Sequence, residues 1–196
     1  MLDALARLAP PRGWRVTVAH VDHGLRPGSA SEAELVASLA DARGLAFRAL
    51  TVEVSGESSI QARARAARYA ALQGEARRVG ASAIALGHTA DDQAETVLMR
   101  ALTGASPKSL LAMTERTGML SRPLLRVWRE QTVGYCRALD LETIDDPSNA
   151  DLRFLRSRVR HQVMPALEAV FPGARRRLVA LAERQRRLFE SSEVAP

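Results

Sequence analysis

The sequence predicts an α/β fold in which helices cover a parallel sheet, followed by a small all-helical extension. Strand-like apolar runs alternate with helical patterns as far as Gly118, and the patterns after it are helical only. Strands that alternate with helices form parallel sheets with right-handed crossovers. We therefore expect two domains, one over residues 1–118 and one over residues 119–196.

Three short runs have the composition of buried parallel strands. Val16–Val21 is rich in β-branched residues, which favour strands that are covered on both faces. The other two expected strands are Phe47–Val54 and Ala83–Gly87. The carboxyl ends of such strands are where open parallel sheets bind their ligands.

Apolar spacing and end signals predict the helices. Leu2–Leu8 has Leu at every third position and stops before a pair of prolines. A capping box between Ser31 and Glu34 opens the next helix, and Gly44 closes it. The remaining expected helices are Ile60–Val79, Asp91–Leu102, Val127–Leu139, Leu152–Leu167 and Ala174–Phe189.

Composition narrows the class of protein. The chain has 196 residues, 46% of them apolar, and can therefore bury a core. It has no run of about 18 apolar residues and no signal-peptide pattern, so we expect a cytosolic protein without a membrane partner. Cys136 is the single cysteine, which excludes an internal disulfide, a CxxC redox pair and a thiolate zinc site within these residues.

The net charge of +6 is confined to the C-terminal part of the chain. Residues 151–190 hold ten arginines and four acidic residues, which accounts for the whole excess. A segregated basic stretch is typical of proteins that contact nucleic-acid phosphates. Compositional drift is the alternative, because Lys108 is the only lysine. Drift explains arginine in place of lysine, but it does not explain the segregation.

Polar, titratable residues follow two of the expected strands. The first cluster is His20, Asp22, His23 and Arg26, and the second is His88, Thr89, Asp91, Asp92, Gln93 and Glu95. Adjacent carboxylates near a helix N-terminus suit Mg²⁺ with substrate phosphates. A cap on the following helix, from Thr89 or Asp91, is the structural alternative, and the spacing leaves both open.

Five motifs in a fixed order carry a resemblance to a known family. They are Val18-Ala-His-Val-Asp-His-Gly-Leu-Arg26, Arg65-Ala-Ala-Arg-Tyr-Ala-Ala-Leu72, Gly87-His-Thr-Ala-Asp-Asp-Gln-Ala-Glu-Thr96, Arg122-Pro-Leu-Leu125, and Asp146-Pro-Ser-Asn149 followed by Arg156-Ser-Arg-Val-Arg160. Together they resemble the bacterial tRNA(Ile)-lysidine synthetases, which are N-type ATP pyrophosphatases of the PP-loop superfamily. The resemblance covers residues 16 to about 165.

The resemblance implies a Rossmann-like, adenine nucleotide alpha hydrolase-like sheet. Residues 1–118 would be a truncated PP-loop catalytic domain, and residues 119–196 an arginine-rich extension that faces tRNA. The family begins with a strand and a Ser-Gly-Gly-x-Asp-Ser loop that are not in this sequence, so we expect a fragment that lacks the first strand. The chain also has Ser157 where the family usually has Asn, and it lacks the family's later tRNA-binding domain.

The resemblance also implies a reaction and its participants. The family uses ATP to adenylate the first anticodon cytidine of tRNA(Ile), which carries a CAU anticodon, and free L-lysine then displaces AMP. It implies ATP and Mg²⁺ as cofactors, and it leaves a homodimer open. The alternatives are a non-catalytic tRNA-binding remnant and a tRNA thiolase of the same superfamily. The thiolase is disfavoured because Cys136 alone cannot supply cysteine pairs or an iron–sulfur cluster.

Site residues are assigned by the same resemblance. His88, Asp91, Asp92 and Arg65 are expected to be catalytic, with Asp91 and Asp92 also holding the metal, and His20, Asp22 and His23 to face the nucleotide. Arg65 has the alternative of a solvated helix residue. The expected tRNA or substrate contacts are Arg156, Arg160, Arg175, Arg176 and Arg177. Arg156 and Arg160 lie four residues apart, hence on one helix face.

Overall fold

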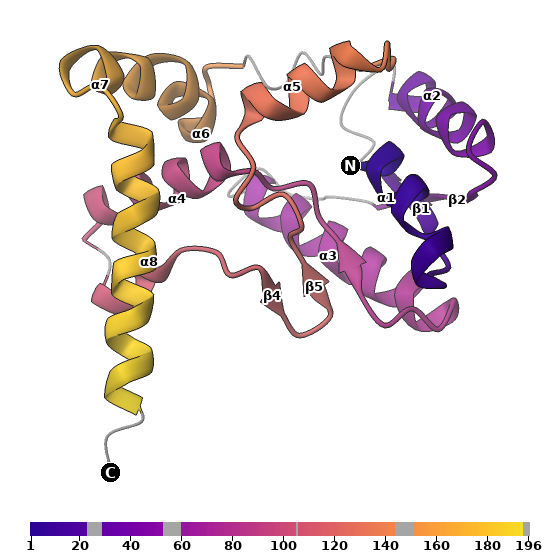
Figure 1. The fold of residues 1–196 in the computed structure, drawn as a ribbon, viewed down its shortest axis with the longest axis horizontal. Coiled ribbons are helices and arrows are strands. Elements are labelled where there is room, and N and C mark those ends of the chain that lie inside the picture. The colour runs from indigo at the N-terminus through magenta and orange to yellow at the C-terminus, as the bar shows by residue number, and fades with distance from the viewer. Residues whose placement is uncertain (23–28, 53–59, 105, 144–150, 194–196) are drawn as a thin grey trace. The chain divides into compact units, whose positions relative to one another are not determined.

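The structure is a computed structural model (Figure 1). It describes residues 1–22, 29–52, 60–104, 106–143 and 151–193. The chain forms two compact units, Met1–Ile84 and Ala85–Pro196. The boundary between these units follows Ile84, whereas the sequence pattern placed a functional boundary after residue 118. The functional boundary stays a proposal. None of the described helices is long and apolar enough to cross a membrane.

The first unit contains a parallel βαβ element. Strand β1 (Thr17–Asp22) and strand β2 (Ala46–Thr51) pair in parallel, with Thr17 opposite Ala46 and Asp22 opposite Thr51. Helix α2 (Ser29–Asp41) connects them, and Gly44 takes a positive φ of 63° in the turn that leads into β2. The expected α/β class with parallel strands is therefore confirmed. Helix α2 begins two residues before the expected Ser31 cap, whose side chain lies outside the described set.

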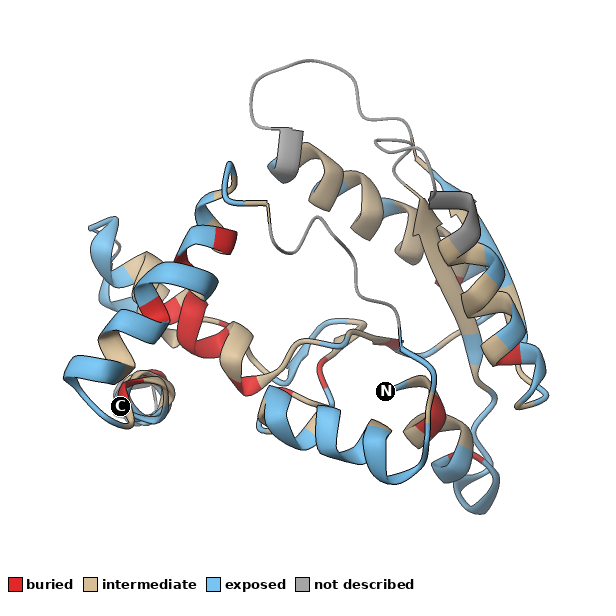
Figure 2. Cartoon of the chain, turned by 90° about the horizontal axis from the view of Figure 1, so that it is seen from above, coloured by how far each residue is buried: buried red, intermediate tan, exposed pale blue. Residues whose placement is uncertain are grey.

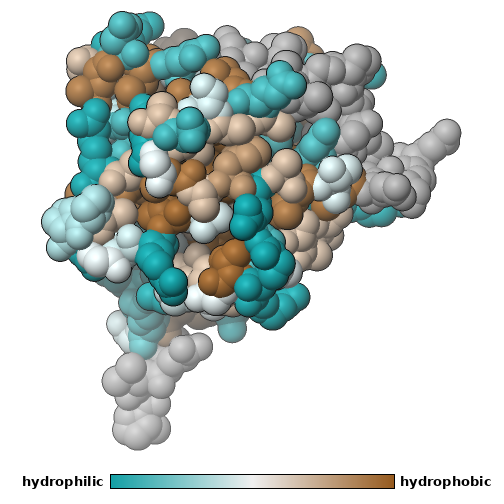
Figure 3. All heavy atoms as spheres, turned by 90° about the vertical axis from the view of Figure 1, so that its right-hand side faces the viewer, coloured by the Kyte–Doolittle hydropathy of each residue, from teal (hydrophilic) through white to brown (hydrophobic). Residues whose placement is uncertain are grey.

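Two further helices complete this unit. Helix α1 (Leu2–Leu8) has the expected bounds and is followed by a 3₁₀ turn at Pro10–Arg12. Asp3 on α1 is buried and accepts hydrogen bonds from Arg7 and from Arg43, at 2.8 and 2.9 Å. Helix α3 (Ile60–Arg78) matches its expected range within one residue. The buried apolar residues of this unit are mainly alanines, and the face in Figure 3 shows apolar patches between hydrophilic side chains.

Strand β3 (Ile84–Ala85) lies at the border of the two units and is shorter than expected. Within the described residues it belongs to a three-stranded sheet of order β3-β5-β4 and not to the sheet of β1 and β2. Strands β4 (Arg116–Thr117) and β5 (Leu120–Ser121) form an antiparallel hairpin around Gly118. The expectation of helices alone after Gly118 was therefore wrong, because two-residue strands leave no periodic pattern to detect.

The second unit is mainly helical, and it holds most of the buried apolar side chains (Figure 2). Its helices are α4 (Ala90–Leu102), α5 (Arg129–Ala138), α6 (Leu155–Arg158), α7 (Met164–Val170) and α8 (Ala174–Glu193). A 3₁₀ turn at Pro107–Leu111 follows α4. Ala94, Val159 and Met164 form the buried centre, with Leu98, Met99, Leu167, Leu178 and Val179 packed around it.

The single helix expected over Leu152–Leu167 is found as three consecutive helical pieces. Helix α6 passes into a π-helical turn over Val159–Val163, and α7 begins at Met164. Pro165 stands near the start of α7, has no N–H, and its ring crowds the carbonyl four residues earlier. The helical run over residues 155–170 is continuous, in keeping with the expected helix, but it contains a π-helical turn that the sequence pattern did not predict.

Helix α8 begins sharply after α7. Gly173 adopts a φ of +83°, a conformation that L side chains rarely adopt. The carboxylate of Glu168 accepts hydrogen bonds from the backbone N–H groups of Gly173 and Arg175, each at 2.8 Å. These are donors that a helix N-terminus otherwise leaves unpaired.

Candidate functional site

The N-terminus of α4 is capped by hydrogen bonds between Thr89 and Asp92. Oδ2 of Asp92 accepts hydrogen bonds from the backbone N–H of Thr89 at 2.7 Å and from its hydroxyl at 3.0 Å. Carboxylates are also stabilised there by the helix dipole. The capping alternative considered from the sequence is therefore present in the structure, and the acid that performs it is Asp92.

The other oxygen of Asp92 belongs to an acidic–arginine cluster, defined as Asp92, Glu95, Arg156 and Arg160. Oδ1 of Asp92 accepts from Nη2 of Arg156 and from Nη2 of Arg160, both at 2.8 Å. Glu95 accepts from Nε of Arg156 at 3.0 Å and from Nε of Arg160 at 2.7 Å. The cluster joins residues more than 60 positions apart in the sequence and balances two negative charges with two positive ones.

Partial burial reduces the screening of these ion pairs by solvent, and it also carries a desolvation cost. The Glu95 side chain is 3% exposed, and those of Arg156 and Arg160 are 34% and 23% exposed. Burial alone would raise the pKa of Asp92, but the hydrogen bond from Thr89 and the charges of Arg156 and Arg160 outweigh it and lower that pKa below its ordinary value. Desolvation opposes the charge of Arg160, but its bonds to Glu95 and Asp92 raise its pKa.

Asp91 faces a different set of partners. Its Oδ2 accepts from the backbone N–H of Arg129 at 2.7 Å, and its Oδ1 lies 3.3 Å from Nη1 of Arg175. The backbone N–H of Ala90 also donates to the carbonyl of Val127 at 3.0 Å. The start of α4 is thus tied to the segment before α5 and to the start of α8.

A magnesium ion would need carboxylate oxygens around α4 that are open to coordination. Each carboxylate oxygen of Asp92 already accepts two hydrogen bonds. In the described part of the chain, no three His, Cys, Asp or Glu residues are grouped as metal ligands. As arranged, Asp92 does not fit a metal ligand, because binding would require the arginines to leave, whereas Asp91 keeps unused acceptor capacity. The assignment of both to Mg²⁺ remains a prediction that this geometry does not support.

The structure brings together five of the predicted site residues. Asp92 meets Arg156 and Arg160, and Asp91 meets Arg175. Arg176 and Arg177 are exposed at the start of α8, and His88 directly precedes the α4 cap.

The other predicted site residues belong to the first unit. His20 and Asp22 are on β1, and His23 lies outside the described residues. Arg65 is on α3, where its Nη2 donates to the hydroxyl of Tyr69 at 2.8 Å and its guanidinium lies 5.0 Å from that ring. The solvated-helix alternative for Arg65 therefore needs amendment, because this arginine is half-buried and paired with an aromatic ring.

Three buried polar residues belong to the polar clusters or motifs of the sequence but were assigned no individual role there. Glu95 centres the acidic–arginine cluster, and its spacing of three from Asp92 places both on one face of α4. That spacing was the signal that could have found it. Gln93 donates to the carbonyl of Met113 and accepts from its N–H, each at 2.9 Å. Arg122 donates to the carbonyl of Thr114 at 2.8 Å and so holds the β4–β5 hairpin. Only the tertiary fold reveals the hydrogen bonds of Gln93 and Arg122.

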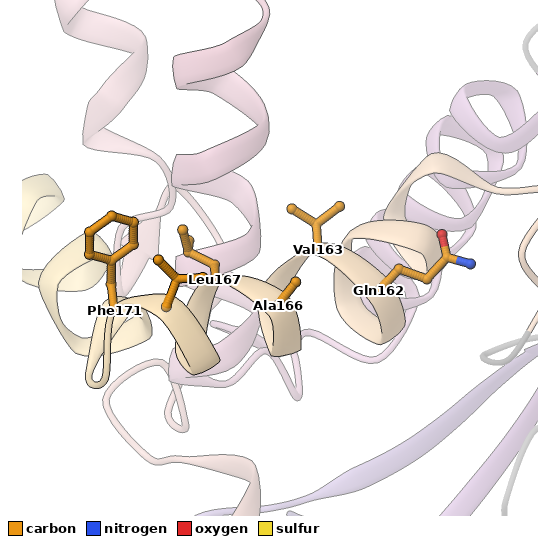
Figure 4. A pocket seen from close by; sticks show the side chains of 6 residues that line it. Gln162, Val163, Ala166, Leu167 and Phe171 are labelled. Carbon is orange, nitrogen blue, oxygen red and sulfur yellow. The ribbon is translucent and has the colours of Figure 1, made fainter.

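An apolar groove runs along the end of the π-helical turn and α7 (Figure 4). It has a volume of about 450 Å³ and is lined by Gln162, Val163, Ala166, Leu167, Val170 and Phe171. None of the predicted site residues lines it. The charged site around α4 and this groove are therefore separate features of the second unit.

Comparison with known proteins defines the class. Residues 1–167 match the model of the PP-loop domain, an ATP-binding family. The chain therefore belongs to the PP-loop family. A solved structure, the U34-tRNA thiolase NcsA from Methanococcus maripaludis with its [4Fe-4S] cluster, aligns over 93% of this chain and 68% of that one, with a TM-score of 0.71. At 15% sequence identity this likeness shows the fold alone.

Curated relatives narrow the resemblance within that class. The tRNA(Ile)-lysidine synthase of Salinispora tropica is 48% identical over 170 residues, which are 84% of this chain and 51% of the relative. The enzyme of the same name from Methylobacterium sp. is 47% identical, covering 95% and 55%, and that from Thermus thermophilus is 43% identical, covering 92% and 36%. These matches confirm the resemblance drawn from the five motifs. The chain spans about half the length of the Salinispora relative.

Proposed function

We propose that this chain carries part of the catalytic region of a tRNA(Ile)-lysidine synthase. In the proposed reaction, a carbonyl oxygen of the first anticodon cytidine attacks the α-phosphorus of ATP, and pyrophosphate leaves. The amino group of free lysine then attacks the adenylated cytidine and displaces AMP. The participants are ATP, lysine and tRNA(Ile) with a CAU anticodon.

The observation that carries the proposal is the convergence of two separate motifs in the acidic–arginine cluster. Residues of the Gly87–Thr96 motif and of the Arg156–Arg160 motif hydrogen-bond directly, although over 60 residues separate them in sequence. Both motifs belong to the set that resembles the lysidine synthetases. Phosphoryl transfer depends on positioning and on neutralisation of charge, which clustered arginines can supply.

The charge balance of the cluster suggests how it meets an anionic substrate. Arg156 and Arg160 are held by Asp92 and Glu95 in the protein alone. A phosphate or carboxylate of the substrate would compete with these acids for the guanidinium donors. Among the described residues, those around α4 do not form a ligand set for Mg²⁺ as arranged.

Lysidine formation tests the proposal directly. A version extended ahead of Met1 by a strand and a Ser-Gly-Gly-x-Asp-Ser loop is incubated with ATP, radiolabelled lysine and a tRNA(Ile) transcript. We expect lysine incorporation that requires ATP and the CAU anticodon, and its loss in Arg160→Ala. The matched control is Arg158→Ala, an exposed neighbour outside the cluster. RNA binding without incorporation in the extended chain would instead favour a non-catalytic tRNA-binding protein.

The oligomeric state is a separate proposal. A homodimer would use apolar surface, and the described groove along α7 is one such surface, with Val170 and Phe171 68% and 54% exposed. Light scattering of the purified chain gives the molar mass, and a monomer at all concentrations would contradict a dimer.

A further inference from the structure

A tryptophan and an arginine stack on one another next to the start of α4. The guanidinium carbon of Arg176 lies 5.4 Å from the centroid of the Trp128 ring. The Arg176 side chain is 71% exposed, and its ion pair with Glu130 is loose, at 3.9 Å between two exposed groups. Such a pair contributes little stability. The Trp128–Arg176 pair therefore joins a half-buried indole to an exposed guanidinium, which the weak ion pair with Glu130 does not hold in place.

Backbone hydrogen bonds hold this pair beside the predicted catalytic carboxylates. The residue before Trp128, Val127, accepts from the N–H of Ala90, and the residue after it, Arg129, donates its N–H to Asp91. Arg175, the neighbour of Arg176 on α8, donates from its side chain to the other oxygen of Asp91, at 3.3 Å. Both partners of the stack are thus one residue away from a direct contact with the first turn of α4.

We propose that Trp128 and Arg176 form a stacking site for an unpaired RNA base next to the residue that is modified. This inference rests on the proposed function, in which the substrate is an anticodon loop. An enzyme that acts on a base must receive it outside the helical stack. Aromatic rings and arginine planes accept unstacked bases, and they do so with little dependence on sequence. The exposed Arg129 adds a charge for the adjoining phosphate.

The chain contains a matched control for this pair. Trp14 is 51% exposed, and the guanidinium of Arg12 lies 5.3 Å from its ring. This second stack has the same chemistry but belongs to the first unit, and neither residue is bonded to α4 in the described structure. If every tryptophan–arginine stack of this chain bound RNA, substitutions in the two pairs would weaken binding equally.

Fluorescence and affinity of the 196-residue chain test the proposal. Because Trp14 and Trp128 are the only tryptophans, Trp14→Phe leaves Trp128 as the single indole reporter. A single-stranded RNA of anticodon-loop sequence should quench it, whereas the same sequence as a duplex should not. Trp128→Ala should raise the Kd for the single strand by about 5- to 100-fold, the range for loss of one stacked base. Trp128→Phe should lose less, and Trp14→Ala should change the Kd less than twofold.

The outcomes separate the possible errors. The cap at Trp128 uses its backbone N–H, which donates to Gln131, so replacing the side chain leaves the cap in place. Circular dichroism checks the fold, and if Trp128→Ala is unfolded, Arg176→Gln provides the second variant, with a smaller expected loss. Equal quenching by single strand and duplex, or equal effects of Trp128→Ala and Trp14→Ala, would overturn the stacking site. The 196-residue chain could show stacking while the version extended ahead of Met1 makes no lysidine. That result would contradict the proposed function and leave the stacking site in place.

Discussion

At the scale of single residues, Asp92 shows how one side chain combines two structural roles. One oxygen caps α4 and the other anchors two arginines. A capping residue at a surface helix would contribute about 1 kcal/mol. Asp92 contributes more here, because removing it also leaves Arg156 and Arg160 with Glu95 as their one remaining acidic partner in the cluster.

The lowered pKa of Asp92 predicts a pH dependence of stability. Its folded pKa lies below the unfolded value near 4, so its contribution is complete above that value and is lost as the pH falls through the folded pKa. In Asp92→Asn we expect a loss of about 1 to 2 kcal/mol at pH 7 and a shallower fall of Tm in acid. Thermal melts between pH 7 and pH 3 measure both.

Asp151→Asn is the control for this experiment. Asp151 also has a lowered pKa, through its hydrogen bonds with Arg153, but the Arg153 side chain is 85% exposed, so solvent screens the pair and Asp151→Asn should leave the melting curve nearly unchanged. Parallel Tm curves for the wild type and Asp92→Asn would contradict the assigned role of Asp92.

At the scale of elements, the helices of the second unit depend on α7 for their common core. Met164 is 2% exposed at the junction of the π-helical turn and α7, and it packs in the cluster with Ala94 of α4. The segment around the π-helical turn therefore supplies both cluster arginines and buried core residues. Helix α6 supplies Arg156, the turn itself supplies Arg160 and the buried Val159, and α7 begins with the buried Met164.

Truncation of this buried side chain should be costly. Met164→Ala removes core contacts and leaves a cavity, so we expect a loss of about 3 kcal/mol in the free energy of unfolding. The control is Val170→Ala on the same helix, which is 68% exposed and should change stability by about 0.5 kcal/mol or less. Urea denaturation measures both variants. Similar midpoints for the two would show that α7 does not pack as described.

At the scale of the whole molecule, the positive charge divides between half-buried arginines paired with acids and exposed arginines. Arg156, Arg160 and Arg175 are committed to acidic partners around α4. Arg177, Arg184 and Arg187 are exposed on α8, and their spacing places them along one side of the helix. Arg175 therefore differs from Arg177, although the two were grouped together as expected tRNA contacts.

The exposed arginines predict a steep salt dependence of RNA binding. In Arg177→Ala with Arg184→Ala, the slope of log K against log salt should fall by about 2, because each lost phosphate contact removes about 0.9. The control exchanges two exposed arginines of the first unit, Arg15→Ala with Arg77→Ala, at the same net charge. Filter binding across salt concentrations gives the slopes. Equal slopes for the two double variants would mean that net charge, and not the α8 surface, determines binding.

Much of the fold was predictable because it is encoded locally. Helices α1, α3, α4, α5 and α8 and strands β1 and β2 follow from periodicity and end signals, and each was found near its expected range. Three features were not predicted: the β4–β5 hairpin, the π-helical turn before Pro165 and the short β3. They depend on single residues or on pairing partners that a window of sequence does not contain.

The sequence by itself determined the family, the parallel βαβ element and the segregation of charge, because motifs, periodicity and composition can be read along the chain. It also named Asp92, Arg156 and Arg160 as candidates. Only the tertiary structure decided that these three meet, that Glu95 completes their cluster, and that Asp91 binds elsewhere. The physical reason is that the packing of α4 against the Val159–Met164 segment brings the guanidinium groups next to the carboxylates. That packing depends on contacts between residues far apart in the sequence, which no local pattern predicts.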